Sequence, residues 1–152
     1  MRVYLMQHGK PIPKEENPER PLSVAGKQDV KKMCDVLRRS GSKIDECVHS
    51  GKTRARETAE ILVSGLNPKI EVKKISGLSP LDEVHEAVQY IKNSKRDVMI
   101  VGHLPHLAKL SSILVSGSES NPVVKFQQGG IVCLEREEGD WVIAWMLVPD
   151  LF

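Results

Sequence analysis

The stretch Arg2–Gly9, with the sequence RVYLMQHG, decides the fold of this 152-residue chain. Its apolar run 3–6 is rich in residues that favour strands, as in a strand covered on both faces by other elements. The run ends at a histidine followed by a glycine, and ligands bind beyond the carboxyl ends of strands in open α/β sheets. His8 is therefore either a functional residue or a polar residue leaving a buried strand, and its position alone leaves both interpretations open.

Strand and helix patterns alternate along the rest of the chain. Apolar residues recur at helical spacing between Ser23, a candidate N-cap, and Gly41. The alternation predicts a three-layer α/β/α sandwich whose mostly parallel central sheet ends in a C-terminal antiparallel hairpin. Apolar residues on both faces of 141–148 predict that this last strand is well covered. Further strands are expected at 44–49, at 70–75 on a sheet edge, at 97–101 and at 131–135, and further helices at 52–66, from 79 and from 104.

Length and composition predict a single domain spanning 1–152. The formal charge is +2, with basic residues scattered among acidic ones, which argues against a nucleic-acid partner. The three cysteines, an odd number without C-x-x-C spacing, favour neither a disulfide framework nor a zinc site. No apolar stretch approaches the roughly 20 residues of a membrane span, so a cytoplasmic protein without a membrane partner is expected.

Polar or basic side chains follow three of the expected strands, at 7–9, 50–54 and 102–105. If these strands are parallel, all three junctions lie on one edge of the sheet. The second and third junctions also begin helices, whose free N–H groups and dipole favour an anion. Two imidazoles, one guanidinium and two helix starts predict a phosphate pocket and no metal site, because no third ligand for zinc has a suitable spacing.

The same residues resemble the signature of the histidine phosphatase superfamily, also called the phosphoglycerate mutase-like family. That signature has Arg-His-Gly after the first strand, Ser-x-x-x-Arg-Ala-x-x-Thr-Ala at the second helix, and a late histidine after a central strand. This chain has Gln7-His8-Gly9, the block SGKTRARETA at 50–59, and Gly102-His103. Its short length and the segments RPLS (20–23) and HLP (103–105) are similar to the SixA-type phosphohistidine phosphatases of that family.

The resemblance implies a phosphatase that needs no metal or cofactor, with His8 as the nucleophile that takes the phosphoryl group. Arg54 and His103 would complete the catalytic set by holding the phosphoryl oxygens and stabilising the transferring group. The implied partner is a phosphorylated histidine phosphotransfer domain or another signalling phosphoprotein. The residues implied to bind phosphate, and hence inorganic phosphate or sulfate, are Gln7, Gly9, Arg20, Arg54 and His103.

Gln7 departs from the family pattern, which has arginine at this position. A glutamine amide can donate but carries no charge. Losing a charge-assisted contact costs a few kcal/mol in the transition state, a rate loss on the order of a hundredfold or more. Three explanations stay open: Lys10, Lys52 or Arg20 compensates; the substrate makes weaker demands; or the chain is a slow phosphatase or a non-catalytic phosphate-binding module.

Structural alternatives also exist for the other residues. Arg54 could be a solvated helix arginine, His103 a satisfied core histidine, and Arg20 a surface ion-pair partner. His106, one turn from His103, is expected on the helix surface.

Asp82 and Glu83 lie near the position of the family's general acid. Both also fit the first turn of a helix, where acids are favoured for structural reasons, and we expect the structural role. Phosphohistidine needs a dedicated acid less, because its leaving nitrogen can already be protonated near neutral pH. A small phosphomonoester stays the alternative substrate.

Overall fold

In the computed structural model, which describes residues 1–152, β1 (Arg2–Gln7) lies within a six-stranded sheet of order β3-β2-β4-β1-β5-β6. β3, β2, β4 and β1 are parallel, whereas β5 pairs antiparallel with both β1 and β6. The mostly parallel sheet with a C-terminal hairpin is thereby confirmed. The other strands are β2 (Glu46–His49), β3 (Glu71–Lys74), β4 (Val98–Gly102), β5 (Ile131–Glu137) and β6 (Asp140–Leu147).

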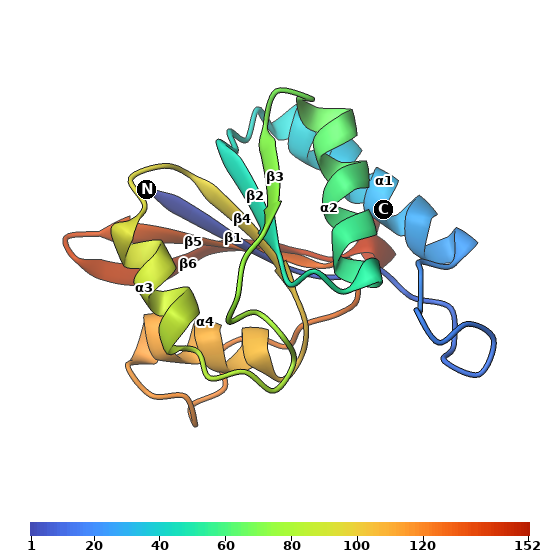
Figure 1. The fold of residues 1–152 in the computed structure, drawn as a ribbon. Coiled ribbons are helices and arrows are strands. Elements are labelled where there is room, and N and C mark those ends of the chain that lie inside the picture. Colours follow the sequence, from blue (N-terminus) through green and yellow to red (C-terminus); the bar gives the residue numbers. More distant parts are fainter.

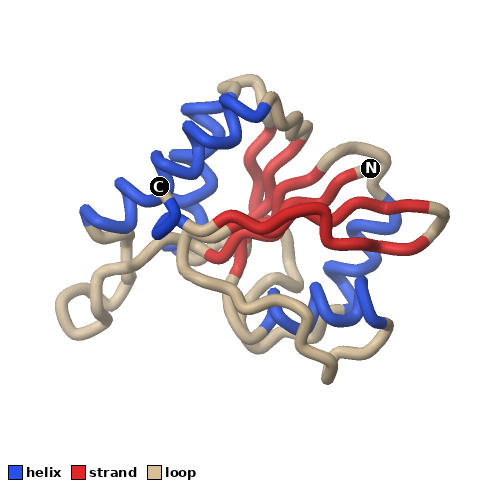
Figure 2. The backbone as a smooth tube through the Cα atoms, turned by 180° about the vertical axis from the view of Figure 1, so that it is seen from behind, coloured by secondary structure: helices blue, strands red, loops and turns tan.

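Helices cover both faces of this sheet (Figures 1 and 2). α1 (Val24–Ser40) and α2 (Thr53–Leu66) lie on one face, and α3 (His85–Asn93) and α4 (His106–Ser116) lie on the other. Alternate side chains of β1 point to opposite faces, so Tyr4 and Met6 pack in one core and Val3 and Leu5 in the other. All four are completely buried, which explains the unbroken apolar run. The three-layer sandwich is confirmed.

Both predicted ends of α1 are confirmed by cap geometry. The Ser23 hydroxyl accepts a hydrogen bond from the Gly26 N–H at 3.0 Å, and Gly41 adopts the left-handed conformation at φ +70°. A short 3-10 helix, η1 (Pro149–Leu151), ends the chain. None of the helices combines the length and the apolar composition needed to cross a membrane.

The third helix begins later than the sequence predicts. Its pattern indicated a start at Ser79-Pro80, but α3 begins at His85. The segment before it forms turns, because the Asp82 carboxylate accepts the Ser79 N–H at 2.9 Å. Asp82 therefore caps a turn and does not lie in the first turn of a helix.

The expected covering of the last strand is wrong. β6 lies at the edge of the sheet and pairs only with β5, and the tip of their hairpin extends past the helices (Figure 2). Trp145 packs against the α1/α2 core and Trp141 against the opposite core. The strand is apolar on both faces because each face contributes one tryptophan to a different core. The side chains of Val142, Ile143 and Met146 are 36–40% exposed.

The parallel arrangement of β1, β4 and β2 brings the three polar junctions to one edge of the sheet. Gln7 is paired with Gly102, and His49 with Val101, so the strands end at nearly the same level. The residues that follow these ends are His8, His103 and Ser50.

Candidate active site

His8 lies directly beyond β1 with its ring held in one orientation. Its Nδ1 is 2.7 Å from the carbonyl oxygen of Gly9, and because a carbonyl only accepts, Nδ1 carries the ring proton. The His8 backbone N–H donates to the Gly102 carbonyl on β4 at 3.1 Å. With the proton on Nδ1, the lone pair of Nε2 is available to attack an electrophile.

The surroundings of His8 keep this imidazole neutral. The pKa of His8 is lowered from 6.5 to about 4, mainly by burial, which disfavours the charged ring. The Gly9 carbonyl opposes the shift, and the positive charges of Arg54 and Arg20 act in the same direction as burial. A histidine with this pKa is an unprotonated nucleophile at neutral pH.

His103 faces the same place from the end of β4. Its ring centroid is 5.0 Å from that of His8, and its side chain is 1% exposed. Its Nε2 lies 2.6 Å from the hydroxyl oxygen of Ser50, whereas its Nδ1 is buried without a partner. Burial, followed by the charges of His8 and Arg54, lowers the pKa of His103 to about 3, so this ring is also neutral.

Two arginines converge on the histidines without an acidic partner. Burial and then the charge of Arg20 lower the pKa of Arg54, so the charges of the two guanidinium groups interact. Neither forms an ion pair, and Nε of Arg54 is buried without a hydrogen bond. Two neighbouring cations with no carboxylate between them form a site for an anion with several acceptor oxygens.

Arg20 reaches this place from the loop between β1 and α1, in a backbone conformation that side chains rarely adopt. Its φ is +50°, and its Nε contacts the Ile12 carbonyl at 3.5 Å. A hydrogen bond joins this loop to the neighbouring helix α2: the Glu57 carboxylate accepts the Leu22 N–H at 2.7 Å. Backbone strain of this kind is retained where the surrounding structure and function require it.

Thr58 joins the loop that carries His8 to α2, which carries Arg54. Its hydroxyl donates to the Arg54 carbonyl at 2.7 Å and accepts the Gly9 N–H at 3.0 Å. Thr58 is completely buried. Ser50, Glu57 and Thr58 were not predicted as site residues, although Ser50 and Thr58 are letters of the 50–59 motif, which is the signal that could have identified them.

Gly9 and Gln7 complete the predicted set. The Gly9 N–H is taken by Thr58, and a Cβ at Gly9 would lie 3.0 Å from Val30 and 3.1 Å from the Gly26 carbonyl, so this glycine allows α1 to approach closely. Gln7 is 8% exposed, and its Oε1 is buried without a partner. The structure thus places Gln7 at the edge of the site, where its side chain has no hydrogen-bond partner in the protein.

The remaining polar residues of this edge have different positions. His106 is completely buried rather than on the helix surface, because backbone groups of Gly77 and Glu83 lie near its ring. Neither ring nitrogen has a hydrogen bond in good geometry. Lys52 is exposed, and its charge helps to lower the pKa of His103. Lys10 is exposed and is not among the charges that shift either histidine.

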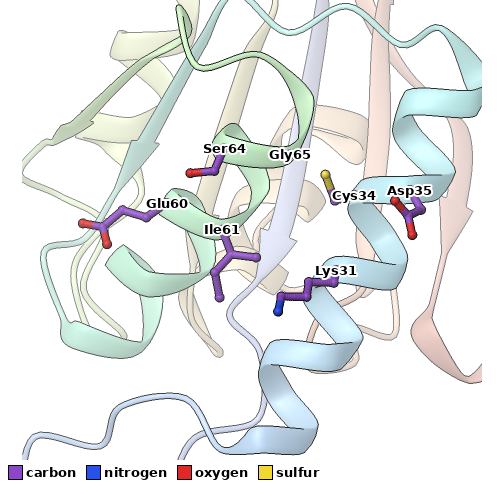
Figure 3. A pocket seen from close by; sticks show the side chains of 7 residues that line it. All are labelled: Lys31, Cys34, Asp35, Glu60, Ile61, Ser64 and Gly65. Atoms are coloured by element: carbon purple, nitrogen blue, oxygen red, sulfur yellow. The ribbon is translucent and has the colours of Figure 1, made fainter.

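One hollow lies away from these residues. It has a volume of about 520 Å³ and lies between α1 and α2 (Figure 3). The side chains around it include Cys34, Glu60 and Ile61. No group of three or more histidine, cysteine or acidic side chains is arranged to hold a metal ion. The convergent cations and imidazoles therefore make the sheet edge the candidate site.

Known structures share this arrangement of elements. The histidine phosphatase SixA complexed with tungstate superposes with a TM-score of 0.88 over 99% of both chains at 22% identity. A phosphoserine phosphatase from Entamoeba histolytica superposes with a TM-score of 0.70 over 95% of both chains at 16% identity.

In sequence, an uncharacterized protein of Picosynechococcus is 25% identical over 142 residues, which are 88% of this chain and 84% of that protein. No protein-family model matches the chain. The chain has the phosphoglycerate mutase-like fold seen in SixA phosphohistidine phosphatases.

Proposed function

We propose that the chain is a phosphatase that works through a phosphohistidine intermediate on His8. The observation that carries this proposal is the state of His8: Nδ1–H is bound to Gly9, Nε2 is free, and two unpaired arginines lie close by. A neutral imidazole beside an anion site is a nucleophile placed next to its electrophile. Tungstate, which SixA binds, is a tetrahedral oxyanion like phosphate, and this agrees with the proposal.

Catalysis begins when the Nε2 lone pair of His8 attacks phosphorus. A nitrogen–phosphorus bond forms while the bond from phosphorus to the leaving group breaks, and the leaving group departs with a proton that it already carries or takes from solvent. Arg54 holds two phosphoryl oxygens bidentately, and Arg20 adds a second positive charge. Water then attacks phosphorus on the opposite side, loses a proton to solvent, and returns His8 to its starting state as phosphate leaves.

The substrate that fits this site best is phosphohistidine on a signalling protein such as a histidine phosphotransfer domain. The Asp82 carboxylate accepts the Ser79 N–H in a turn, which supports a structural role for this residue rather than that of a general acid. A phosphohistidine nitrogen can be protonated before it leaves and does not require a dedicated acid. The arginines supply the positive charge that a metal would otherwise provide, and neutral His103 can add a hydrogen bond.

Labelling tests the covalent step. The protein is incubated with phosphoramidate, digested, and mapped by mass spectrometry under alkaline conditions that preserve phosphohistidine. We expect the phosphoryl group on His8 and none in His8→Gln. His85→Gln, which changes an exposed histidine of α3, is the matched control and retains full labelling. Wild-type protein that binds phosphate but never becomes labelled or turns over would show a phosphate-binding module instead.

A substrate comparison tests the specificity. Release of phosphate is measured from a phosphorylated histidine phosphotransfer domain, from phosphoserine and from a sugar phosphate, all at the same enzyme concentration. We expect kcat/KM to be highest for the phosphohistidine protein. The fold of the phosphoserine phosphatase makes phosphoserine the informative competitor, and a higher kcat/KM for it would identify a small-molecule phosphomonoesterase.

A further inference from the structure

The Ser50–His103 contact is the only hydrogen bond made by the His103 ring. Ser50 Oγ lies 2.6 Å from Nε2, and Ser50 is 7% exposed. The same oxygen accepts the Lys52 backbone N–H at 3.3 Å. The backbone of Ser50 is set by the neighbouring turn, in which the Gly51 N–H donates to His49 Nδ1 at 3.0 Å. Both groups of the contact are thus held by their surroundings.

The hydrogen bonds around Ser50 Oγ indicate which atom donates. Oγ of a serine has one proton to give and two lone pairs to accept with. If His103 Nε2–H donated, Oγ would accept two N–H groups, and its own proton would be left in a nearly buried place with no acceptor. If the Ser50 O–H donates to Nε2, the hydroxyl proton and the Nε2 lone pair are matched while Oγ still accepts the Lys52 N–H, and the proton left without a protein acceptor is Nδ1–H of His103.

We propose that Ser50 selects the tautomer of His103 by donating its hydroxyl proton to Nε2, so that the ring proton resides on Nδ1 and is available to a phosphoryl oxygen. Ser50 is then a positioning residue, acting through His103. This inference rests on the proposed function for its consequence in catalysis, although the tautomer itself is a property of the free protein. The unpartnered Nδ1 is the atom that the proposal turns into a donor.

The proposal gives the two neighbouring imidazoles complementary tasks. His8 uses its Nδ1–H on the Gly9 carbonyl and offers the lone pair of Nε2. His103 uses the lone pair of Nε2 on Ser50 and offers the proton of Nδ1. The opposite tautomer of His103 would offer a lone pair at Nδ1, which repels phosphoryl oxygens. Burial keeps both rings neutral, so each has a single proton to assign.

Nitrogen-15 NMR of the full chain with labelled histidine tests the assignment, because protonated and bare ring nitrogens differ in chemical shift and coupling. The His103 signals are those absent from His103→Gln. We expect Nδ1–H in the wild type and in Ser50→Thr, which keeps the hydroxyl, and a shift toward Nε2–H in Ser50→Ala. Nε2–H in the wild type, or an unchanged tautomer in Ser50→Ala, would overturn the proposal.

Kinetics show whether the tautomer matters for turnover. We expect kcat to fall about a hundredfold in Ser50→Ala, since a misplaced donor loses transition-state stabilisation, and to recover in Ser50→Thr. Ser112→Ala is the matched control: it removes a buried hydroxyl that bonds only the Ala108 carbonyl in α4, and we expect wild-type kcat. If His103 shows the expected tautomers but no variant, wild type included, forms phospho-His8, the proposed function fails and the tautomer assignment stands.

Discussion

The two ends of the central sheet differ in whether their charged side chains have partners of opposite charge. At the amino end of β2, Glu46 is 3% exposed, yet its carboxylate accepts hydrogen bonds from Arg96 at 2.9 Å and Tyr90 at 3.1 Å. Lys73 adds an ion pair at 3.7 Å. At the carboxyl end, the charges of Arg54 and Arg20 interact, and neither guanidinium group forms an ion pair. The buried charge at the amino end is paired, and we call this the closed end. The charges at the carboxyl end are unpaired, and we call this the open end.

Unpaired polar atoms mark the same difference. The buried side-chain nitrogen and oxygen atoms that lack a partner all belong to four residues at the carboxyl end: Gln7, Arg54, His103 and His106. Leaving such atoms unpaired costs about 1–3 kcal/mol each, so they persist where a ligand or a function compensates. One end of the sheet therefore pairs its buried charge, while the other keeps buried hydrogen-bonding groups without protein partners.

The largest effect is expected from Arg54→Lys, which keeps the charge and removes the planar fork at the open end. We expect kcat/KM to fall about a thousandfold, because lysine cannot bind two phosphoryl oxygens in the same geometry. Steady-state kinetics and a circular dichroism spectrum of the folded variant measure this. Activity within threefold of the wild type would mean that Arg54 does not hold the phosphoryl group.

Gln7→Arg would add a third cation to the open end. We expect kcat to rise, by up to about a hundredfold, because the new guanidinium makes a charge-assisted contact with the transferring group. The measurement is phosphate release from the phosphohistidine protein at saturating concentration. An unchanged or lower kcat would count against the placement of Gln7 at the phosphate.

Arg96→Ala would remove the ion pair between Arg96 and the buried Glu46 at the closed end. We expect the free energy of unfolding in urea to fall by about 1.5 kcal/mol, since Glu46 stays buried while losing a charged donor; the half-exposed arginine and the remaining Lys73 limit the loss. The kcat of the folded protein should not change. A loss of kcat without a loss of stability would contradict the division of roles between the two ends.

Arg20→Gly separates strain from function. Glycine tolerates φ +50°, so relief of about 1 kcal/mol of strain should offset the added backbone entropy, and stability should be kept. Arg20→Ala retains the strain and should be the less stable variant in urea. Both variants should bind phosphate about tenfold more weakly in calorimetry, by loss of one charge-assisted contact. Unweakened binding would place Arg20 outside the anion site.

The smallest effect is expected from mild acid. Because the pKa of His8 is about 4, Nε2 stays unprotonated at pH 5.5, and kcat/KM, corrected for ionisation of the substrate, should change less than twofold between pH 7 and 5.5. A histidine with its ordinary pKa of 6.5 would lose about tenfold over this range. An acid limb near 6.5 would show that His8 is not the buried nucleophile.

Stability should respond to acid in the same window. The unfolded chain binds a proton at His8 near pH 6.5 and the folded chain only near pH 4, so the unfolded state binds more protons between these values. The free energy of unfolding therefore falls as the pH decreases from about 6.5 toward 4. His103, whose pKa is lowered to about 3, acts in the same direction.

The sequence by itself determined the layers and the location of the site. The apolar run of β1 and the periodic faces of the helices depend on burial, which is a local property of residue type and spacing. Polar residues after three strand ends were sufficient to predict that His8, Arg54 and His103 meet, because parallel strands end at one edge. Arg54 and Arg20 are both partly buried, and Arg20 forms no ion pair.

Tertiary structure alone decided the contacts between elements. Ser50 bonds a histidine 53 residues away, and Thr58 bonds a glycine 49 residues away, and no periodicity encodes such pairs. The burial of His106, the late start of α3 and the exposure of β6 likewise depend on which segment packs over which. Hydrogen-bond partners, tautomers and pKa values follow from distances in the folded chain, and these exist only after the strands and helices have been brought together.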